Sequence, residues 1–433
     1  MAISAGNRKG SSSVFLCMVM SSVLLLVGIL GHAAAGTASR SYVYSVFDLA
    51  GCSVLSEYDR ALKTRYGIFG FSMEGEDVEE LFCSYAEKSF TDRDGKINLL
   101  PLKIEDIKVD ISEYSLTNPD LLEGQIIEHM SYRVVRKSLK ILEALAALKD
   151  KDTQEPGEKS PEARRGRTLR SGKVIEELPS RLLQGAGGRL INIPDLPLPG
   201  EMGRIAYNQL CLNLYILEYF RHGLDDNGSE DTFFFNEIEY IICGRLSDEA
   251  NRNIVYLSLL AFRTLVNAAH IYSDEIKWEA VTAAAVLAGG GVATVAAQAA
   301  IALIWAGAEA AIDMSRLEKG GRVPLIKTAD DWRLDLSKAL EGDTENNGLQ
   351  NEDNDGLCYE DYLFLLLCFT DREGKLIRCM DLIQLNMKGL YNEYFNMSRC
   401  KAGFAYESKV LRKAVFPGIF HFQNGEFSGQ HVY

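Results

Sequence analysis

The sequence predicts a helix-dominant α+β protein, in which a long N-terminal membrane helix continues into a stalk and then into a mixed globular ectodomain. Three observations lead to this prediction. The segment Val14–Gly31 is uncharged and largely apolar. Most later apolar residues recur at helical spacing, and only a few short segments resemble strands. The chain has 433 residues, enough for two or three domains with their own cores.

The N-terminal segment is predicted to cross a membrane. No Lys, Arg, Asp or Glu lies between Lys9 and Arg40. A helix rises about 1.5 Å per residue, so this stretch can span a hydrocarbon core about 30 Å thick. Arg8 and Lys9 precede the segment, and positive charge favours the cytoplasmic side. We therefore expect a single-pass protein of the cell membrane, with a cytoplasmic N-terminus and most of the chain outside the cytoplasm.

A cleaved signal peptide is the alternative for the same segment. Ala33–Ala35 followed by Gly36 would suit a signal peptidase, which requires small residues. The apolar run is longer than the usual signal core of about 7–15 residues, which favours a retained anchor. Apolar residues continue at helical spacing from Val43 to Leu62 without proline. This spacing predicts a stalk that ends near Gly67 or Gly70 and packs laterally against other helices.

Four parts of the chain are predicted from changes in composition. Residues 1–70 form the membrane anchor and amphipathic stalk helix, 71–150 an α+β segment, 151–190 a polar linker, and 191–433 a helix-rich α+β ectodomain. The linker is charged, contains prolines and glycines, and shows little periodicity.

Helices and strands in these parts follow from the spacing of apolar residues. Helices are expected at Asp77–Ser89, Asp120–Leu148, Glu201–Phe220, Asp248–Tyr272 and Tyr359–Tyr394, with a break in the last near Asp371–Gly374. Strands are expected at Lys103–Ser115, which alternates polar and apolar residues, at the aromatic and β-branched Thr232–Cys243, and at Ala402–Val410.

A second uncharged stretch, Ala280–Ala308, permits two interpretations. It is rich in Ala and Gly and contains the triplet Gly289–Gly291, which weakens a helix by about 1 kcal/mol per Gly. We favour two helices that are broken at the glycines and buried against each other. The alternative is a membrane hairpin or span, because small residues allow close helix contacts in a bilayer and cations follow the stretch.

Overall charge and cysteine spacing exclude some partners and sites. The formal net charge is −14, and an acidic surface repels phosphate backbones, so we expect no nucleic acid partner. The nine cysteines include no CxxC pair, so the sequence indicates neither a zinc site nor a thioredoxin-like motif. Disulfide pairing outside the cytoplasm remains open.

Several segments resemble functional motifs but lack an essential residue. The residues around Asp92 and Asp94, and those around Asp353 and Asp355, resemble calcium loops without the acidic twelfth residue. The glycines at Gly185–Gly188 and at the triplet lack the ending of a phosphate-binding loop. The six histidines (His32, His129, His222, His270, His421 and His431) are isolated.

Glu237 and Glu239 would share one face of the predicted strand, and a polar outer face accounts for them more simply than acid–base chemistry. We therefore predict no enzyme and no catalytic, cofactor-binding or metal-binding residues.

A family resemblance extends this interpretation. Arg8–Phe15, followed by an apolar helix, resembles the start of TadE/TadG-type pseudopilins of tight-adherence (Flp) pilus systems. Six further segments resemble a group of large uncharacterised bacterial proteins with that start: Ser56–Arg60, Tyr66–Phe69, Glu237–Ile241, Ser247–Asn251, Val323–Lys327 and Tyr359–Leu363.

The resemblance implies a non-enzymatic, membrane-anchored structural or assembly component of a tight-adherence pilus or related surface system. Its partners would be the lipid bilayer and other pilus or envelope subunits. Prepilins of this system typically have Glu at the fifth position after the cleaved Gly, whereas Phe15 stands there after Gly10. An anchored extracellular binding module, such as an adhesin or receptor, is the alternative function.

Overall fold

The computed structural model describes residues 9–90, 102–146, 167, 172–182, 202–225, 232–289, 294–342, 356–412 and 423–433. The chain forms two compact units. The first, here called the anchor unit, comprises Met1–Arg60, Phe69–Leu116 and Arg399–Tyr433, and the second, the helical unit, comprises Ala61–Ile68 and Thr117–Ser398. Helices dominate and one small antiparallel sheet accompanies them, which confirms the predicted α+β class.

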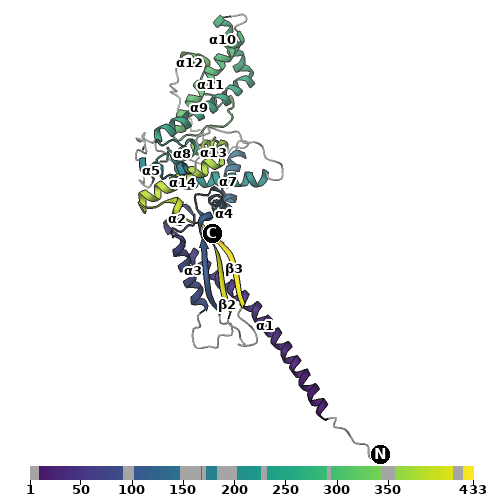
Figure 1. The fold of residues 1–433 in the computed structure, drawn as a ribbon. Coiled ribbons are helices and arrows are strands. Elements are labelled where there is room, and N and C mark those ends of the chain that lie inside the picture. The colour runs from purple at the N-terminus through teal and green to yellow at the C-terminus, as the bar shows by residue number, and fades with distance from the viewer. Residues whose placement is uncertain are drawn as a thin grey trace, which may run out of the picture. The chain divides into compact units, whose positions relative to one another are not determined.

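The anchor unit combines two helices with a three-stranded antiparallel sheet (Figure 1). Its elements are α1 (Lys9–Leu55), α3 (Gly75–Phe90), β1 (Leu102–Asp110), the short 3-10 helix η1 (Ser112–Tyr114), β2 (Gly403–Arg412) and β3 (Gln423–Val432). The strand order is β1-β2-β3, with Leu102 opposite Arg412 and Gly403 opposite Val432. The sheet therefore joins an early segment of the chain to its C-terminal hairpin.

The apolar stripe of α1 forms the core of the anchor unit. Phe47 is completely buried, and its ring lies 5.5 Å from that of Phe82 on α3 and 5.4 Å from that of Tyr406 on β2. The helical spacing predicted from Val43 onwards is thus present. The lateral partner of this stripe is a helix of the same chain, α3, and the chain's own sheet also covers it.

The predicted stalk also ends earlier than expected. Helix α1 ends at Leu55, and a separate short helix, α2 (Arg60–Tyr66), follows. The backbone N–H of Asp59 donates to the carbonyl oxygen of Gly70 at 2.8 Å instead of continuing the helical ladder. A tertiary hydrogen bond therefore turns the chain, although no proline or glycine marks the position.

The helical unit is built around α14 (Arg372–Leu390), in which every residue from Gly374 to Met387 is buried. The other helices of this part are α4 (Pro119–Ala146), α5 (Gly172–Glu176), α6 (Pro179–Leu182), α7 (Met202–Tyr219), α8 (Glu237–Cys243) and α13 (Tyr359–Phe369). The predicted break between the last two long helices is confirmed. Asp371 caps α14 by accepting a hydrogen bond from the backbone N–H of Gly374 at 2.9 Å.

A layered group of helices completes the helical unit: α9 (Asp248–Ser273), α10 (Glu275–Gly289), α11 (Thr294–Glu318) and α12 (Leu336–Glu341) (Figure 1). Its core contains Val281 and Ala285 of α10 together with Ile301, Ala302 and Trp305 of α11. This confirms the prediction of two packed helices within Ala280–Ala308. Gly289 is the last residue of α10, and Gly290 and Gly291 lie outside the described residues.

The strand predicted at Thr232–Cys243 is wrong, because the structure forms helix α8 there. Gly244 ends this helix in the left-handed region, with φ of +69°, and its N–H donates to the carbonyl oxygen of Tyr240. Aromatic and β-branched residues favour a strand locally, but a short apolar run cannot distinguish a strand from a buried helix.

The remaining predicted elements agree with the structure within a few residues. They are α3, β1, α4, α7, α9 and β2. Strand β3 was not predicted. The predicted division at residues 70, 150 and 190 follows the order of the sequence, whereas the compact units combine distant segments. Most of the predicted linker, the Asp92 and Asp94 segment, the Asp353 and Asp355 segment, and Gly185–Gly188 lie outside the described residues.

Candidate functional site

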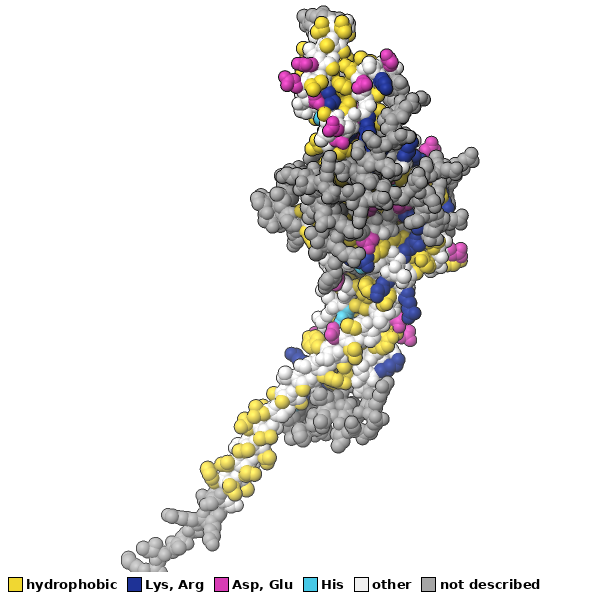
Figure 2. All heavy atoms as spheres, turned by 180° about the vertical axis from the view of Figure 1, so that it is seen from behind, with side chains coloured by type: hydrophobic (Ala, Val, Ile, Leu, Met, Phe, Trp, Pro, Cys, Tyr) yellow, Lys and Arg dark blue, Asp and Glu magenta, His cyan; other side chains and the backbone are white. Residues whose placement is uncertain are grey.

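The first half of α1 carries a continuous exposed apolar surface. Nearly all side chains from Val14 to Leu30 are exposed, and Figure 2 shows hydrophobic side chains along this helix. Residues 14–31 extend about 27 Å at 1.5 Å per residue, close to the hydrocarbon thickness of about 30 Å. Helix α1 is thus long and apolar enough to cross a bilayer.

Polar groups along this surface are satisfied within the helix. The hydroxyl of Ser21 donates to the carbonyl oxygen of Cys17 at 2.7 Å, and that of Ser22 donates to Val19 at 2.8 Å. In hydrocarbon, where water is absent, such internal bonds remove the cost of an unsatisfied donor. At the C-terminal end of the apolar surface, the guanidinium of Arg412 lies 3.2 Å from Nδ1 of His32. A charged group therefore marks the end of the apolar segment.

Two helices of the helical unit also have the length and composition of a span. They are α9 and α11. The structure buries 33% of the most apolar stretch of α9 and 39% of that of α11, but 0% of that of α1. The partial burial distinguishes them from α1, because these helices already supply the core of their own unit.

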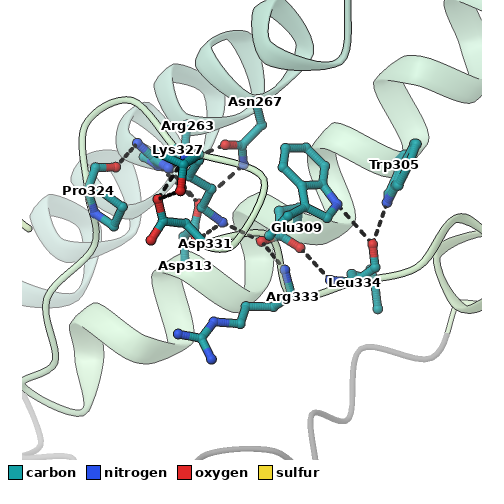
Figure 3. A network of polar contacts seen from close by, with 12 residues as sticks. Arg263, Asn267, Trp305, Glu309, Asp313, Pro324, Lys327, Asp331, Arg333 and Leu334 are labelled. Atoms are coloured by element: carbon teal, nitrogen blue, oxygen red, sulfur yellow. Dashed lines mark hydrogen bonds and ion pairs between the residues drawn. The ribbon is translucent and has the colours of Figure 1, made fainter. Parts of the chain in front are cut away.

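A buried ionic cluster holds the loop after α11 onto α9 and α11 (Figure 3). Arg263 of α9 pairs with Asp313 of α11, with 2.9 Å between Nη2 and Oδ2. Lys327 of the loop pairs with the other carboxylate oxygen of Asp313 at 2.6 Å and also with Glu309. All four side chains are at most 4% exposed, and two cations balance two carboxylates.

Hydrogen bonds satisfy the remaining polar atoms of the cluster. The guanidinium of Arg263 donates to the carbonyl oxygens of Pro324 and Leu325 at 3.0 and 2.8 Å. Glu309 accepts the backbone N–H groups of Arg333 and Leu334 at 3.1 and 3.0 Å. Burial raises the pKa of Glu309, and Lys327 opposes this effect.

The ionic cluster therefore positions a loop and leaves no polar atom directed toward a ligand. A buried pair is retained only with good geometry, because desolvation of both charges is costly. Sequence reasoning missed this cluster. Its signal is the pair of acids Glu309 and Asp313, four residues apart on a helix whose neighbouring positions are apolar.

Glu237 and Glu239 lie on the short helix α8, and both are completely buried rather than on a polar outer face. Glu237 accepts the amide of Asn386 at 2.6 Å and the backbone N–H of Arg221 at 3.0 Å. Glu239 accepts the backbone N–H of Gly223 at 2.9 Å. Burial raises the pKa of each carboxyl to about 7, which their hydrogen bonds only partly oppose.

The second oxygen of Glu239, Oε2, has no hydrogen-bond partner, while Oε1 also accepts the hydroxyl of Tyr359 at 2.9 Å. Glu239 lines a cavity of about 10 Å³ together with Arg252, Glu318 and Tyr359. This volume is at the lower limit for a single water molecule. The cavity can hold a water beside a titratable carboxyl, but no organic substrate.

A buried lysine forms a second polar site in the same unit. The ammonium of Lys375 donates to Gln209, Asn213 and the carbonyl oxygen of Leu367 at 2.9, 2.7 and 3.0 Å. Burial lowers the pKa of Lys375 to about 8. All three contacts are neutral acceptors within the packed helices, so they fix α14 in place.

The anchor unit carries an acidic groove of about 840 Å³ between α3 and β1. Among the residues that the structure describes, its walls contain one cation, Lys88, and the carboxylates of Glu76, Glu79, Glu80, Glu87, Glu105 and Asp106. Glu79 accepts the backbone N–H of Val109 at 3.3 Å and so links the two walls. The charge of this groove favours basic groups over anions.

The histidines and cysteines form no common site within the described residues. No three His, Cys, Asp or Glu side chains there are arranged to hold a metal ion. His129 shares a hydrogen bond with the Tyr219 hydroxyl, and His421 lies outside the described residues. All nine cysteines are free thiols in the structure.

A family of unknown function, DUF5702, matches residues 164–411, which is more than half of the chain. No curated protein and no solved structure matches the chain.

Proposed function

We propose that this chain, which belongs to the family of unknown function DUF5702, is a membrane-anchored structural or assembly component of a tight-adherence pilus or a related surface system. The observation that supports this proposal is the division of α1. Its first half exposes an apolar surface, while its second half is part of a folded core.

The apolar first half of α1 is therefore continuous with the folded part of the anchor unit. Helix α1 runs without a break from Lys9 to Leu55, and Phe47 fixes its second half to the sheet. A continuous helix transmits position and force from the bilayer to the folded unit, whereas a flexible linker would not. Rigid attachment is a property that a structural or assembly subunit requires.

The start of the sequence supports the choice of system. Arg8–Phe15 followed by the apolar segment resembles TadE/TadG-type pseudopilins. Phe15 replaces the Glu that prepilins of this system typically carry, so a minor or assembly role fits better than polymerisation into a fibre core. Lys9 at the start of α1 favours a cytoplasmic N-terminus, with most of the chain outside the cytoplasm.

An anchored extracellular binding module is a second candidate, and the acidic groove favours it. A concave surface of about 840 Å³ with six carboxylates is of the size and charge that a basic ligand would occupy. Either function is proposed as non-enzymatic.

The first test is to express the intact chain in its own cell type, fractionate the membranes and read the mature N-terminus. A start at or before Ser11 in the membrane fraction would support the proposal, and a cut directly after Gly10 would strengthen the link to pili. A start at Gly36 in the soluble fraction would contradict it.

The second test addresses the pilus system itself. A gene deletion should reduce surface fibres or adherence, and the intact chain should restore them. Unchanged fibres in the deletion strain, together with binding of a basic ligand that depends on Glu79 and Glu80, would favour the binding module instead.

A further inference from the structure

The helical unit has a second exposed apolar surface at the tip formed by α10 and α11. Leu287 is 88% exposed and Val295 is 75% exposed, with Val286, Leu303 and Ile304 also exposed. Figure 2 shows hydrophobic side chains gathered over these two helices. We call this surface the apolar tip; it comprises the described residues of Ala280–Ala308.

Two polar side chains of the apolar tip pair with each other across its helices. Gln298 of α11 donates its amide hydrogen bond to the hydroxyl of Thr282 on α10, at 3.2 Å. Both side chains are partly buried. Pairing across the two helices removes their hydrogen-bonding groups from the outer surface, as in helices that pack within lipid. The exposed side chains of the apolar tip that the structure describes are therefore all apolar.

Charges and aromatic rings mark the base of the apolar tip. Glu279 is the last charged residue of α10, and Glu309 is the first of α11. Directly below the uncharged part, the rings of Tyr272 and Trp278 lie 4.9 Å apart. Tyr and Trp concentrate at the level of lipid headgroups, where one side of the ring is apolar and the other is wet. Charged residues and the aromatic pair therefore lie together at the base of the apolar tip, as residues do at the headgroup level of a membrane.

The length of the uncharged part of α10 corresponds to one leaflet. Residues 280–289 extend about 15 Å at 1.5 Å per residue. Half of a hydrocarbon core of about 30 Å is also about 15 Å. Helix α10 is therefore too short to cross a bilayer, but long enough to place Leu287 near its midplane.

We infer that the apolar tip inserts into one leaflet of a lipid bilayer, as a contact additional to α1, with Tyr272 and Trp278 at headgroup level. A second copy of the chain fits this surface less well than lipid does. Protein interfaces carry about one hydrogen bond per 100–200 Å², and the exposed residues described here offer no side-chain donor or acceptor.

Tryptophan fluorescence can test this inference in the full chain. The three tryptophans are Trp278, Trp305 and Trp332, so none lies in α1. Leu287→Trp adds a reporter at the apolar tip, and Tyr394→Trp is the matched control at a position that is 80% exposed outside it. Both variants are reconstituted into phosphatidylcholine vesicles with and without brominated acyl chains.

We expect the added emission of Leu287→Trp to shift to the blue and to be quenched at least twofold more by brominated lipid than that of Tyr394→Trp. Equal quenching of the two would overturn the inference. A blue shift without bromine quenching, accompanied by a doubled mass in detergent, would assign the surface to a second copy and also overturn it. Flotation of the unmodified chain with the vesicles tests membrane anchoring by α1 separately. A chain that is not anchored can therefore be distinguished from an anchored chain whose apolar tip does not contact lipid.

Discussion

Gly51 of α1 lies directly against the imidazole ring of His431 on β3, and a Cβ at residue 51 would overlap that ring. The ring of His431 in turn stacks on that of Tyr406 at 5.6 Å between centroids and 11° between planes. The absence of a side chain at residue 51 therefore allows α1 to approach the sheet.

Gly51→Ala is expected to destabilise the anchor unit. Forcing the largely buried ring of His431 away from Tyr406 should cost about 1–3 kcal/mol, against a gain in helix propensity of up to about 1 kcal/mol. Thermal unfolding in detergent measures the change. Gly28→Ala is the matched control on the same helix, because no atom lies within 4 Å of the added Cβ. Equal stability of the two variants would contradict the close contact.

Because one face of α1 is part of the core, substitutions on its buried and exposed faces should differ in their effect on stability. Phe47→Ala should lower the free energy of unfolding by about 3–5 kcal/mol, because it leaves a cavity among the rings of four aromatic residues. Leu49→Ala should change it little, since Leu49 is 62% exposed. Chemical denaturation of both variants provides the comparison. A similar small loss in both would mean that the sheet does not cover α1.

In the exposed first half of α1, charged substitutions should weaken insertion into the membrane. Replacing both Leu24 and Leu25 with Arg should cost roughly 5–7 kcal/mol of insertion free energy, at about 2.5–3.5 kcal/mol per residue. The chain should then leave the membrane fraction. Leu49→Arg introduces a charge beyond Arg40 and should leave the fractionation unchanged. Membrane retention of the double variant would argue against α1 as the principal anchor.

Removing one member of the buried ionic cluster should cost far more than removing an exposed ion pair. Arg263→Met leaves Asp313 with one cation and removes the donor to the carbonyl oxygens of Pro324 and Leu325. We therefore expect the free energy of unfolding to fall by about 3–5 kcal/mol. Arg252→Met removes a pair with Glu318 in which both side chains are over a third exposed, and should cost about 0–1 kcal/mol. Urea unfolding curves distinguish the two, and equal losses would show that the cluster is solvated.

Glu239 should make the stability of the helical unit depend on pH. Burial raises its pKa from 4.5 to about 7, so the folded state binds the proton more tightly than the unfolded state. The stabilisation is complete below pH about 4.5 and is lost as the pH rises through about 7. Glu239→Gln should therefore show a smaller fall in unfolding free energy between pH 5 and 8 than the unmodified chain. Parallel pH profiles would refute the assignment.

Sequence periodicity predicted most helices, because their apolar stripes face the core at regular spacing. The start of helix α14 was predictable for another reason, because Asp371 supplies a recognisable cap there. Helix α8 was not predicted. Its seven residues include Ile238, Tyr240 and Ile241, which favour a strand locally. Tertiary hydrogen bonds from distant backbone groups to Glu237 and Glu239 stabilise the helix, and a single sequence does not reveal them.

Strand β3 was missed for a related reason. Its sequence, Gln423–Val432, contains glycines and polar residues, and Phe427 is its only large buried apolar side chain among the described ones. Pairing with β2 along its whole length determines the strand. The buried ionic cluster was also hidden, because Arg263, Asp313 and Lys327 come together only when α9, α11 and the following loop pack.

The pairing of β1 with β2 has a consequence for how the protein is made. Leu102 of β1 pairs with Arg412 of β2, so the ribosome must add about three hundred further residues before these two strands can pair. At about 5–20 residues per second, this delay is roughly 15–60 seconds. During that time the membrane can already hold the start of α1, while the face around Phe47 has no sheet to cover it. Biogenesis therefore requires that this face be shielded until translation ends.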